Sequence, residues 1–121
     1  MSRAKIITDK EGRFYGIEWV CPGCQLLHHQ LDGLHILPVD WTPEGLQRSP
    51  NIRGTSWGFN GNLDRPTFTP SVLSRWNAWT GRDTPPRDCV CHSFVTDGRI
   101  QFLPDCTHAL AGQTVDLPEI T

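Results

Sequence analysis

The sequence lacks a long hydrophobic run, an excess of charge of one sign and a convincing helix. No apolar stretch in its 121 residues approaches the roughly 18 residues that cross a membrane, so we expect no membrane partner. The 11 basic and 13 acidic residues give a net charge of −2, which argues against a nucleic-acid-binding surface. No leader with a charged start and an apolar centre opens the chain, so we expect a cytoplasmic protein.

Prolines and glycines interrupt the chain often. The 10 prolines and 11 glycines favour short strands and loops over long helices. We predict strands at 13–20, 34–39, 72–79 and 114–117 and a β-hairpin over 91–104. Pro66 and Pro70 argue against a helix or a central strand between 63 and 70. The prediction is an all-β fold, in which residues 1–121 form a small single domain with a sheet or barrel-like form and little helix.

Two of the five cysteines lie in a metal-binding spacing. Cys21 and Cys24 stand in Cys-Pro-Gly-Cys, directly after a predicted strand and before a predicted extended return, as in a zinc knuckle. Clustered thiols in a reducing compartment bind metal more often than they form disulfides. Zinc is preferred because thiolate and imidazole ligands suit it, and the carboxylate sets that hold magnesium or calcium are missing.

A second Cys/His pattern spans the predicted C-terminal hairpin. Its turn is Asp97-Gly98, so the strand ends that carry Cys91 and His92 should lie beside those that carry Cys106 and His108. The alternation of side chains directs Cys91 and Cys106 toward the knuckle and His92 toward the opposite face, near Asp105. His108 lies beyond the reliable register and could serve either face. The predicted Zn²⁺ ligands are therefore drawn from Cys21, Cys24, Cys91, Cys106 and His108.

Other candidate ligands have weaker support. His28 and His29 lie close enough to Cys24 to replace a missing ligand. His35 stands in an apolar run and is expected to be structural, and Cys89 is the weakest candidate of the thiols.

Two segments resemble a small family of unknown function found in tailed phages and prophages. They are 57–71, with Trp-Gly-Phe-Asn-Gly-Asn and Arg-Pro-Thr-Phe-Thr-Pro-Ser, and 91–114, with Asp-Cys-Thr-His-Ala-Leu-Ala-Gly-Gln-Thr. Members are often labelled ammonia monooxygenase, although nothing in this chain resembles a membrane copper enzyme. The resemblance implies a phage protein in a bacterial host cytoplasm or a virion, with a shared site around His92, Asp105 and His108. Relatives of this family also occur in bacterial gene clusters for ubiquitin-like conjugation. The resemblance therefore also implies a peptidase role as one expectation.

The leading functional prediction is a small zinc-binding phage protein that acts as an interaction module for a host or phage protein. The alternative is a zinc-dependent hydrolase, such as a peptidase, with His92, Asp105 and His108 as catalytic residues. It would need three protein ligands, an open position for water and an acid or base such as Asp105 or Asp97.

Two serines raise the further option of a serine nucleophile. Ser71 follows Thr-Pro, and Ser93 stands beside His92. A serine becomes a nucleophile only when a base lies within hydrogen-bond reach, so without that geometry both are expected to be ordinary serines.

Overall fold

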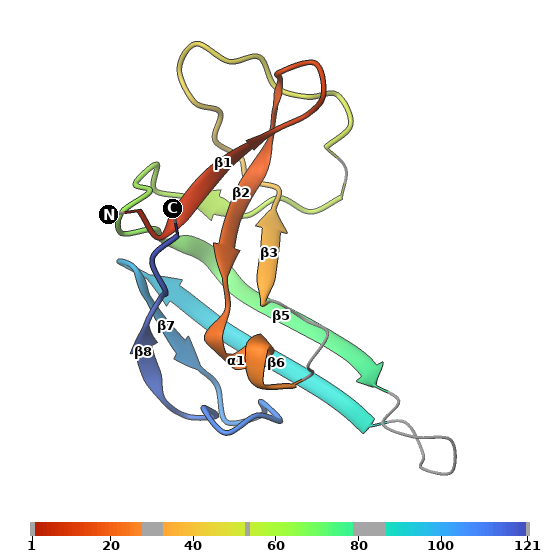
Figure 1. Ribbon diagram of the computed structural model, residues 1–121, viewed down its shortest axis with the longest axis vertical. Helices are drawn as coiled ribbons and strands as arrows, with labels where there is room; N and C mark the ends of the chain where they lie inside the picture. The colour runs from red at the N-terminus through yellow and green to blue at the C-terminus, as the bar shows by residue number, and fades with distance from the viewer. Residues whose placement is uncertain (1, 28–32, 53, 79–86, 121) are drawn as a thin grey trace.

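The protein folds into two antiparallel sheets. The computed structural model describes residues 2–27, 33–52, 54–78 and 87–120 (Figure 1). A three-stranded sheet has the order β1 (Ala4–Thr8), β2 (Phe14–Val20), β3 (Leu34–Leu37). A five-stranded sheet has the order β4 (Gly58–Phe59), β5 (Phe68–Ala78), β6 (Arg87–Thr96), β7 (Arg99–Phe102), β8 (Thr114–Asp116). The all-β prediction is confirmed, and the described strands form two open sheets without closing a barrel.

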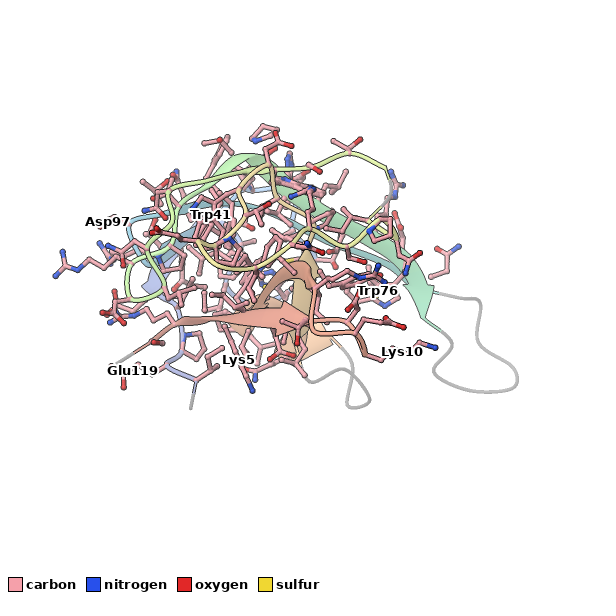
Figure 2. The ribbon with its side chains drawn as sticks, turned by 90° about the horizontal axis from the view of Figure 1, so that it is seen from above. Lys5, Lys10, Trp41, Trp76, Asp97 and Glu119 are labelled. Carbon is pink, nitrogen blue, oxygen red and sulfur yellow. The ribbon has the colours of Figure 1, made fainter. Side chains whose placement is uncertain are left out.

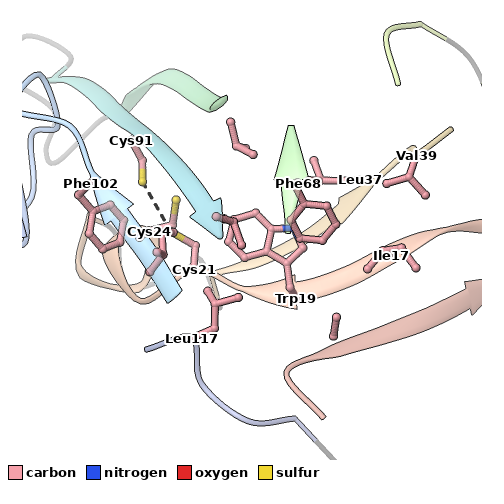
Figure 3. Close-up of a cluster of buried hydrophobic side chains, with 14 of the residues drawn as sticks. Ile17, Trp19, Cys21, Cys24, Leu37, Val39, Phe68, Cys91, Phe102 and Leu117 are labelled. Carbon is pink, nitrogen blue, oxygen red and sulfur yellow. Dashed lines mark hydrogen bonds between the residues drawn. The ribbon is translucent and has the colours of Figure 1, made fainter. Parts of the chain in front are cut away.

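The hydrophobic core lies between the two sheets. Trp19 of β2 and Phe68 of β5 are both almost fully buried, and their ring centroids are 5.8 Å apart (Figure 3). Val95, Ile100 and Phe102 complete this part of the core from β6 and β7. Complete burial of one such apolar side chain stabilises the fold by about 1.5–3 kcal/mol. This interface therefore determines which face of β6 points into the core.

The strand before the knuckle is where the sequence places it, but the segment after it differs. β2 runs directly into Cys21, whereas residues Pro22–Leu27 form the short helix α1 in place of the predicted extended return. Pro22 suits the first position of a helix because its missing N–H needs no partner there. The N–H of Gln25 then donates to the Cys21 carbonyl oxygen at 3.2 Å.

The prediction that Pro70 excludes a central strand is wrong. β5 contains Pro70 and lies between β4 and β6. The ladder accommodates the proline through an irregularity, because the pairs Phe68–Val95 and Val72–Ser93 leave three residues of β5 opposite the single residue Phe94. Such a bulge releases backbone groups from the ladder, so the absent proline N–H costs no strand pairing.

The C-terminal hairpin has the predicted register. Thr96 pairs with Arg99 and Ser93 with Phe102, and the turn residues Asp97 and Gly98 have φ values of 52° and 77°. β7 ends at Phe102, before Pro104, and the predicted tail strand is present as β8. In the described part of the chain, no helix has the length and apolar character needed to cross a membrane.

Candidate active site

Thiols from three elements meet at the inner face of β6. Cys21 follows β2, Cys24 lies in α1 and Cys91 lies in β6, and their sulfur atoms are all within 4.8 Å of one another. Figure 3 shows the three side chains turned toward each other beside Phe102. A second group shares Cys91 and adds Cys106 and His108 within the same limit. These five residues could hold a metal ion, as the spacing predicts.

Two distances in this cluster are close to those between ligands of one tetrahedral metal ion. The Cys21 and Cys91 sulfur atoms are 3.6 Å apart, and the Nε2 atom of His108 is 3.4 Å from the Cys91 sulfur. Ligands in tetrahedral positions around zinc would be separated by about 3.8 Å for two sulfurs and about 3.6 Å for sulfur and nitrogen. The donor types and both separations are therefore compatible with a bound metal ion.

A glycine lets α1 approach the histidine of this cluster. A Cβ atom at Gly23 would collide with the His108 ring and would lie 2.7 Å from the Phe102 ring. His108 packs edge-on against Phe102, with ring centroids 4.5 Å apart. Burial lowers the pKa of His108, which favours the neutral imidazole that binds a metal.

Hydrogen bonds among the three thiols shift their pKa values in opposite directions. Hydrogen bonds from Cys24 and Cys91 lower the pKa of Cys21, and the bond to Cys21 raises the pKa of Cys24 to about 12. The pKa of Cys91 is also raised, first by its hydrogen bonds to Cys21 and Cys24 and then by burial. A bound divalent cation would stabilise all three groups as thiolates.

The weaker candidate ligands lie at the margin of this cluster or outside it. The Nε2 atom of His35 is 3.3 Å from the Cys24 sulfur, and its ring stacks on Trp19 at 4.8 Å. Cys89 is buried and belongs to neither donor group among the described residues. His28 and His29 lie outside the residues that the structure describes.

The opposite face of β6 carries a different constellation. The Nε2 atom of His92 lies 3.0 Å from Ser71 Oγ, and its Nδ1 atom lies 3.2 Å from Asp105 Oδ2. The base that a serine nucleophile requires is therefore within hydrogen-bond reach of Ser71. The His92 side chain is 26% exposed, so a substrate can reach it from solvent.

The hydrogen-bond partners of His92 define its tautomer. An ionised carboxylate only accepts hydrogen bonds, so the Nδ1 atom that faces Asp105 must carry the proton. Nε2 is then unprotonated in the neutral ring and accepts the hydrogen bond from the Ser71 hydroxyl. This is the arrangement needed to remove the hydroxyl proton during a nucleophilic attack.

Strand geometry positions the serine and the histidine. Cys91 and Ser93 point into the core, so the alternation of β6 turns His92 outward. Ser71 lies in the irregular part of β5 opposite Phe94. The indole N–H of Trp57 donates to the Ser71 carbonyl oxygen at 3.2 Å, which holds this part of the strand.

A tight turn brings Asp105 to His92 and links the constellation to the thiols. The Leu103 N–H donates to the His92 carbonyl oxygen at 2.9 Å, and the Cys106 N–H donates to the Leu103 carbonyl oxygen at 3.2 Å. The Cys106 sulfur also accepts from the His92 N–H and donates to the His92 carbonyl oxygen, both at 3.2 Å. Cys106, which follows Asp105, therefore contacts the backbone of His92.

The structure separates the residues that the sequence groups together. His92 and Asp105 do meet on one face, but His108 lies with the thiols on the other. Ser93 is 1% exposed and points inward, so it is no candidate nucleophile. Asp97 lies at the hairpin tip, where its carboxylate is 3.7 Å from Arg65, and Figure 2 shows it at one end of the molecule.

A serine, a histidine and an aspartate in hydrogen-bonded series, on a small protein of two β-sheets, match the geometry that serine hydrolases use. Residues 2–103 match the family described as bacterial ubiquitination-like system serine protease (BubE), so the chain belongs to this family. Ser71 and His92 lie inside the matched segment, and Asp105 follows closely after it. The comparisons with curated proteins and with solved structures found no significant match.

Proposed function

We propose that the protein is a serine protease in which Ser71 is the nucleophile, His92 the general base and Asp105 the residue that orients His92. The observation that carries this proposal is the series of two contacts at His92, 3.0 Å to Ser71 and 3.2 Å to Asp105. The family supports the same chemistry by its description as a serine protease of a ubiquitination-like system.

The three side chains supply the proton transfers of peptide-bond cleavage. Ser71 Oγ attacks the carbonyl carbon while its proton moves to His92 Nε2, and the carboxylate of Asp105 stabilises the resulting imidazolium. His92 then gives this proton to the leaving amine, the C–N bond breaks and an acyl ester remains on Ser71. Water attacks the ester with His92 again as base, which releases a carboxylic acid and restores the serine hydroxyl.

The geometry favours catalysis by the serine over the two functions that the sequence favours. A zinc hydrolase built on His92, Asp105 and His108 would need these residues at one site, and His108 lies instead beside Cys91. An interaction module needs no serine within hydrogen-bond reach of a histidine that an aspartate orients. The metal prediction is compatible with the protease, because the donors and the triad use opposite faces of β6.

We assign the zinc a structural role, with Cys21, Cys24, Cys91 and His108 as its ligands. A zinc ion held by these residues would cross-link β2 and α1 to β6, and four protein ligands leave no open position for a substrate. We choose His108 over Cys106 because its ring nitrogen faces Cys91, whereas the Cys106 sulfur already bonds the His92 backbone.

The membership of the family also suggests the biological setting. We propose that the substrate is a polypeptide handled by a ubiquitination-like system, as the family description states for its members. The partner of this chain is then its protein substrate.

Hydrolysis of p-nitrophenyl acetate tests the catalytic role of Ser71. We expect a burst of nitrophenol as the serine is acylated, followed by slower turnover, and a loss of about 10⁴-fold or more in kcat for Ser71→Ala. Ser93→Ala is the matched control, because it removes the same hydroxyl from a serine next to His92 on the inner face, and it should keep the burst. Equal activity of Ser71→Ala and the wild type, or loss in the Ser93→Ala variant alone, would contradict the proposal.

A further inference from the structure

Two large apolar side chains are exposed on the catalytic face of the five-stranded sheet. Leu73 is 55% exposed and Phe94 is 43% exposed. A single exposed apolar side chain is common on a protein surface and needs no explanation. Two exposed apolar side chains on neighbouring paired strands are less usual, because such side chains normally lie under another layer. These two are close to the proposed catalytic residues, because each lies two residues after one of them along its strand.

The strand register places both side chains around the reacting atoms. Leu73 is the direct cross-strand partner of His92, and it lies two residues after Ser71 on β5. Phe94 lies two residues after His92 on β6, and it is the residue opposite the irregular segment that contains Ser71. Because residues two apart share a face at a spacing of about 6.6 Å, Ser71, Leu73, His92 and Phe94 occupy the corners of one small patch.

The patch is bounded by polar groups. Beyond Leu73, Arg75 forms an ion pair with Asp88 at 3.0 Å, so the charges there are already paired. Beyond Phe94, the cross-strand partner is Gln101 of β7. Leu73 and Phe94 therefore each have a polar neighbour on the side away from Ser71 and His92.

From this arrangement we infer that Leu73 and Phe94 form a specificity subsite that receives an apolar side chain of the polypeptide next to the bond that Ser71 cleaves. The inference rests on the proposed function and goes beyond it by naming the residues that select the substrate. A scissile carbonyl must approach to about 3 Å from Ser71 Oγ, and the side chains on adjoining residues then fall within reach of both apolar neighbours.

The expected selectivity follows from the burial of apolar surface. A leucine or phenylalanine side chain in the substrate would cover Leu73 and Phe94, whereas an acidic one would be desolvated there without a partner. A shallow apolar site discriminates by about 10-fold or more in kcat/KM, which is equivalent to about 1.4 kcal/mol.

Cleavage of a peptide mixture derived from a whole-proteome digest tests the subsite. We expect leucine, isoleucine, phenylalanine or methionine to be enriched about 10-fold at one position within two residues of the cut. Leu73→Asn and Phe94→Ser should each remove this preference from the peptides that are cleaved. Leu34→Asn and Tyr15→Ser, which alter exposed residues of the other sheet, are the matched controls and should retain it.

The outcomes separate this inference from the proposed function. Cleavage without apolar enrichment, or enrichment that persists in both Leu73→Asn and Phe94→Ser, overturns the subsite and leaves the triad intact. A burst that is equal in the wild type and Ser71→Ala overturns the triad and the subsite with it. A dimer that Leu73→Asn converts to monomer without a change in preference would assign the patch to a second copy of the chain and overturn the subsite.

Discussion

At the scale of single residues, the chemistry depends on how His92 is held. Its Nδ1 atom faces a carboxylate and its Nε2 atom faces a hydroxyl, so Asp105 determines which nitrogen can act as a base. An amide in place of that carboxylate could donate a hydrogen bond to Nδ1 and stabilise the wrong tautomer. The ring would then offer Ser71 a proton it cannot use.

Asp105→Asn should therefore lower kcat by about 10⁴-fold while leaving the fold unchanged. The matched control is Asp97→Asn, because Asp97 is also exposed and asparagine tolerates its positive φ of 52°. Its ion pair with Arg65 joins two exposed side chains and contributes little. Comparable activity of the two variants, measured as the rate of p-nitrophenyl acetate hydrolysis, would show that Asp105 does not orient the base.

At the scale of elements, the sequence predicts one half of the site and not the other. The turn signal Asp97-Gly98 and the alternation of side chains place Cys91 inward and His92 outward, and the structure has both. Asp105 follows from the same hairpin. The sequence offers Ser71 and Ser93 as candidate serines but does not choose between them, because the position of Ser71 depends on a bulge that puts three residues of β5 opposite Phe94.

The short helix α1 also differs from its prediction, and it packs closely against a residue that is distant in the sequence. A metal knuckle requires only that Cys21 and Cys24 lie close together, which an extended turn and a helical turn both achieve. The contact between Gly23 and His108 joins residues 85 positions apart, so no local pattern reveals it. The close approach of α1 to His108 requires a residue without a side chain at position 23.

Gly23→Ala tests the role of α1. Alanine favours a helix over glycine by about 1 kcal/mol, yet here its Cβ would collide with His108 and Phe102, and we expect a net loss of about 1–3 kcal/mol of unfolding free energy. Bound zinc should fall in parallel. Gly45→Ala, at a positive φ of 88° with open space around it, should lose about 1–2 kcal/mol but keep its zinc. Full zinc content in Gly23→Ala would disprove the contact between the helix and the metal site.

At the scale of the whole molecule, β6 separates two sites by the alternation of its side chains. Its inner face contributes Cys91 to the thiol cluster that connects β2 and α1 to the second sheet. Its outer face contributes His92 to the triad. Because Cys106 follows Asp105 and bonds the His92 backbone, we expect order in the thiol cluster to help keep Asp105 in contact with His92.

Metal removal should therefore unfold the core and abolish the reactivity of Ser71 at the same time. The purified protein should contain about one equivalent of zinc, and chelation should abolish both the cooperative thermal transition and the acylation burst, because structural zinc contributes about 10–16 kcal/mol of binding free energy in small domains. Ser71→Ala should lose zinc and structure in the same way. Less than about half an equivalent of zinc in the purified protein, or an unchanged melting temperature after chelation, would refute the structural metal.

Single-ligand variants identify the fourth ligand. His108→Ala should lower zinc affinity, whereas Cys106→Ser should keep the zinc and slow acylation by loosening the His92 backbone. The reverse pattern, with zinc lost in Cys106→Ser and retained in His108→Ala, would assign the fourth position to Cys106.

The most direct test of the central claim is the site of reaction with diisopropyl fluorophosphate, which modifies activated serines. We expect a single adduct on the peptide that contains Ser71, found by mass spectrometry of the digested protein, and none in His92→Ala. A folded, zinc-loaded wild-type protein that forms no adduct, or that forms it on a different serine, would contradict the account of Ser71, His92 and Asp105 as a catalytic triad.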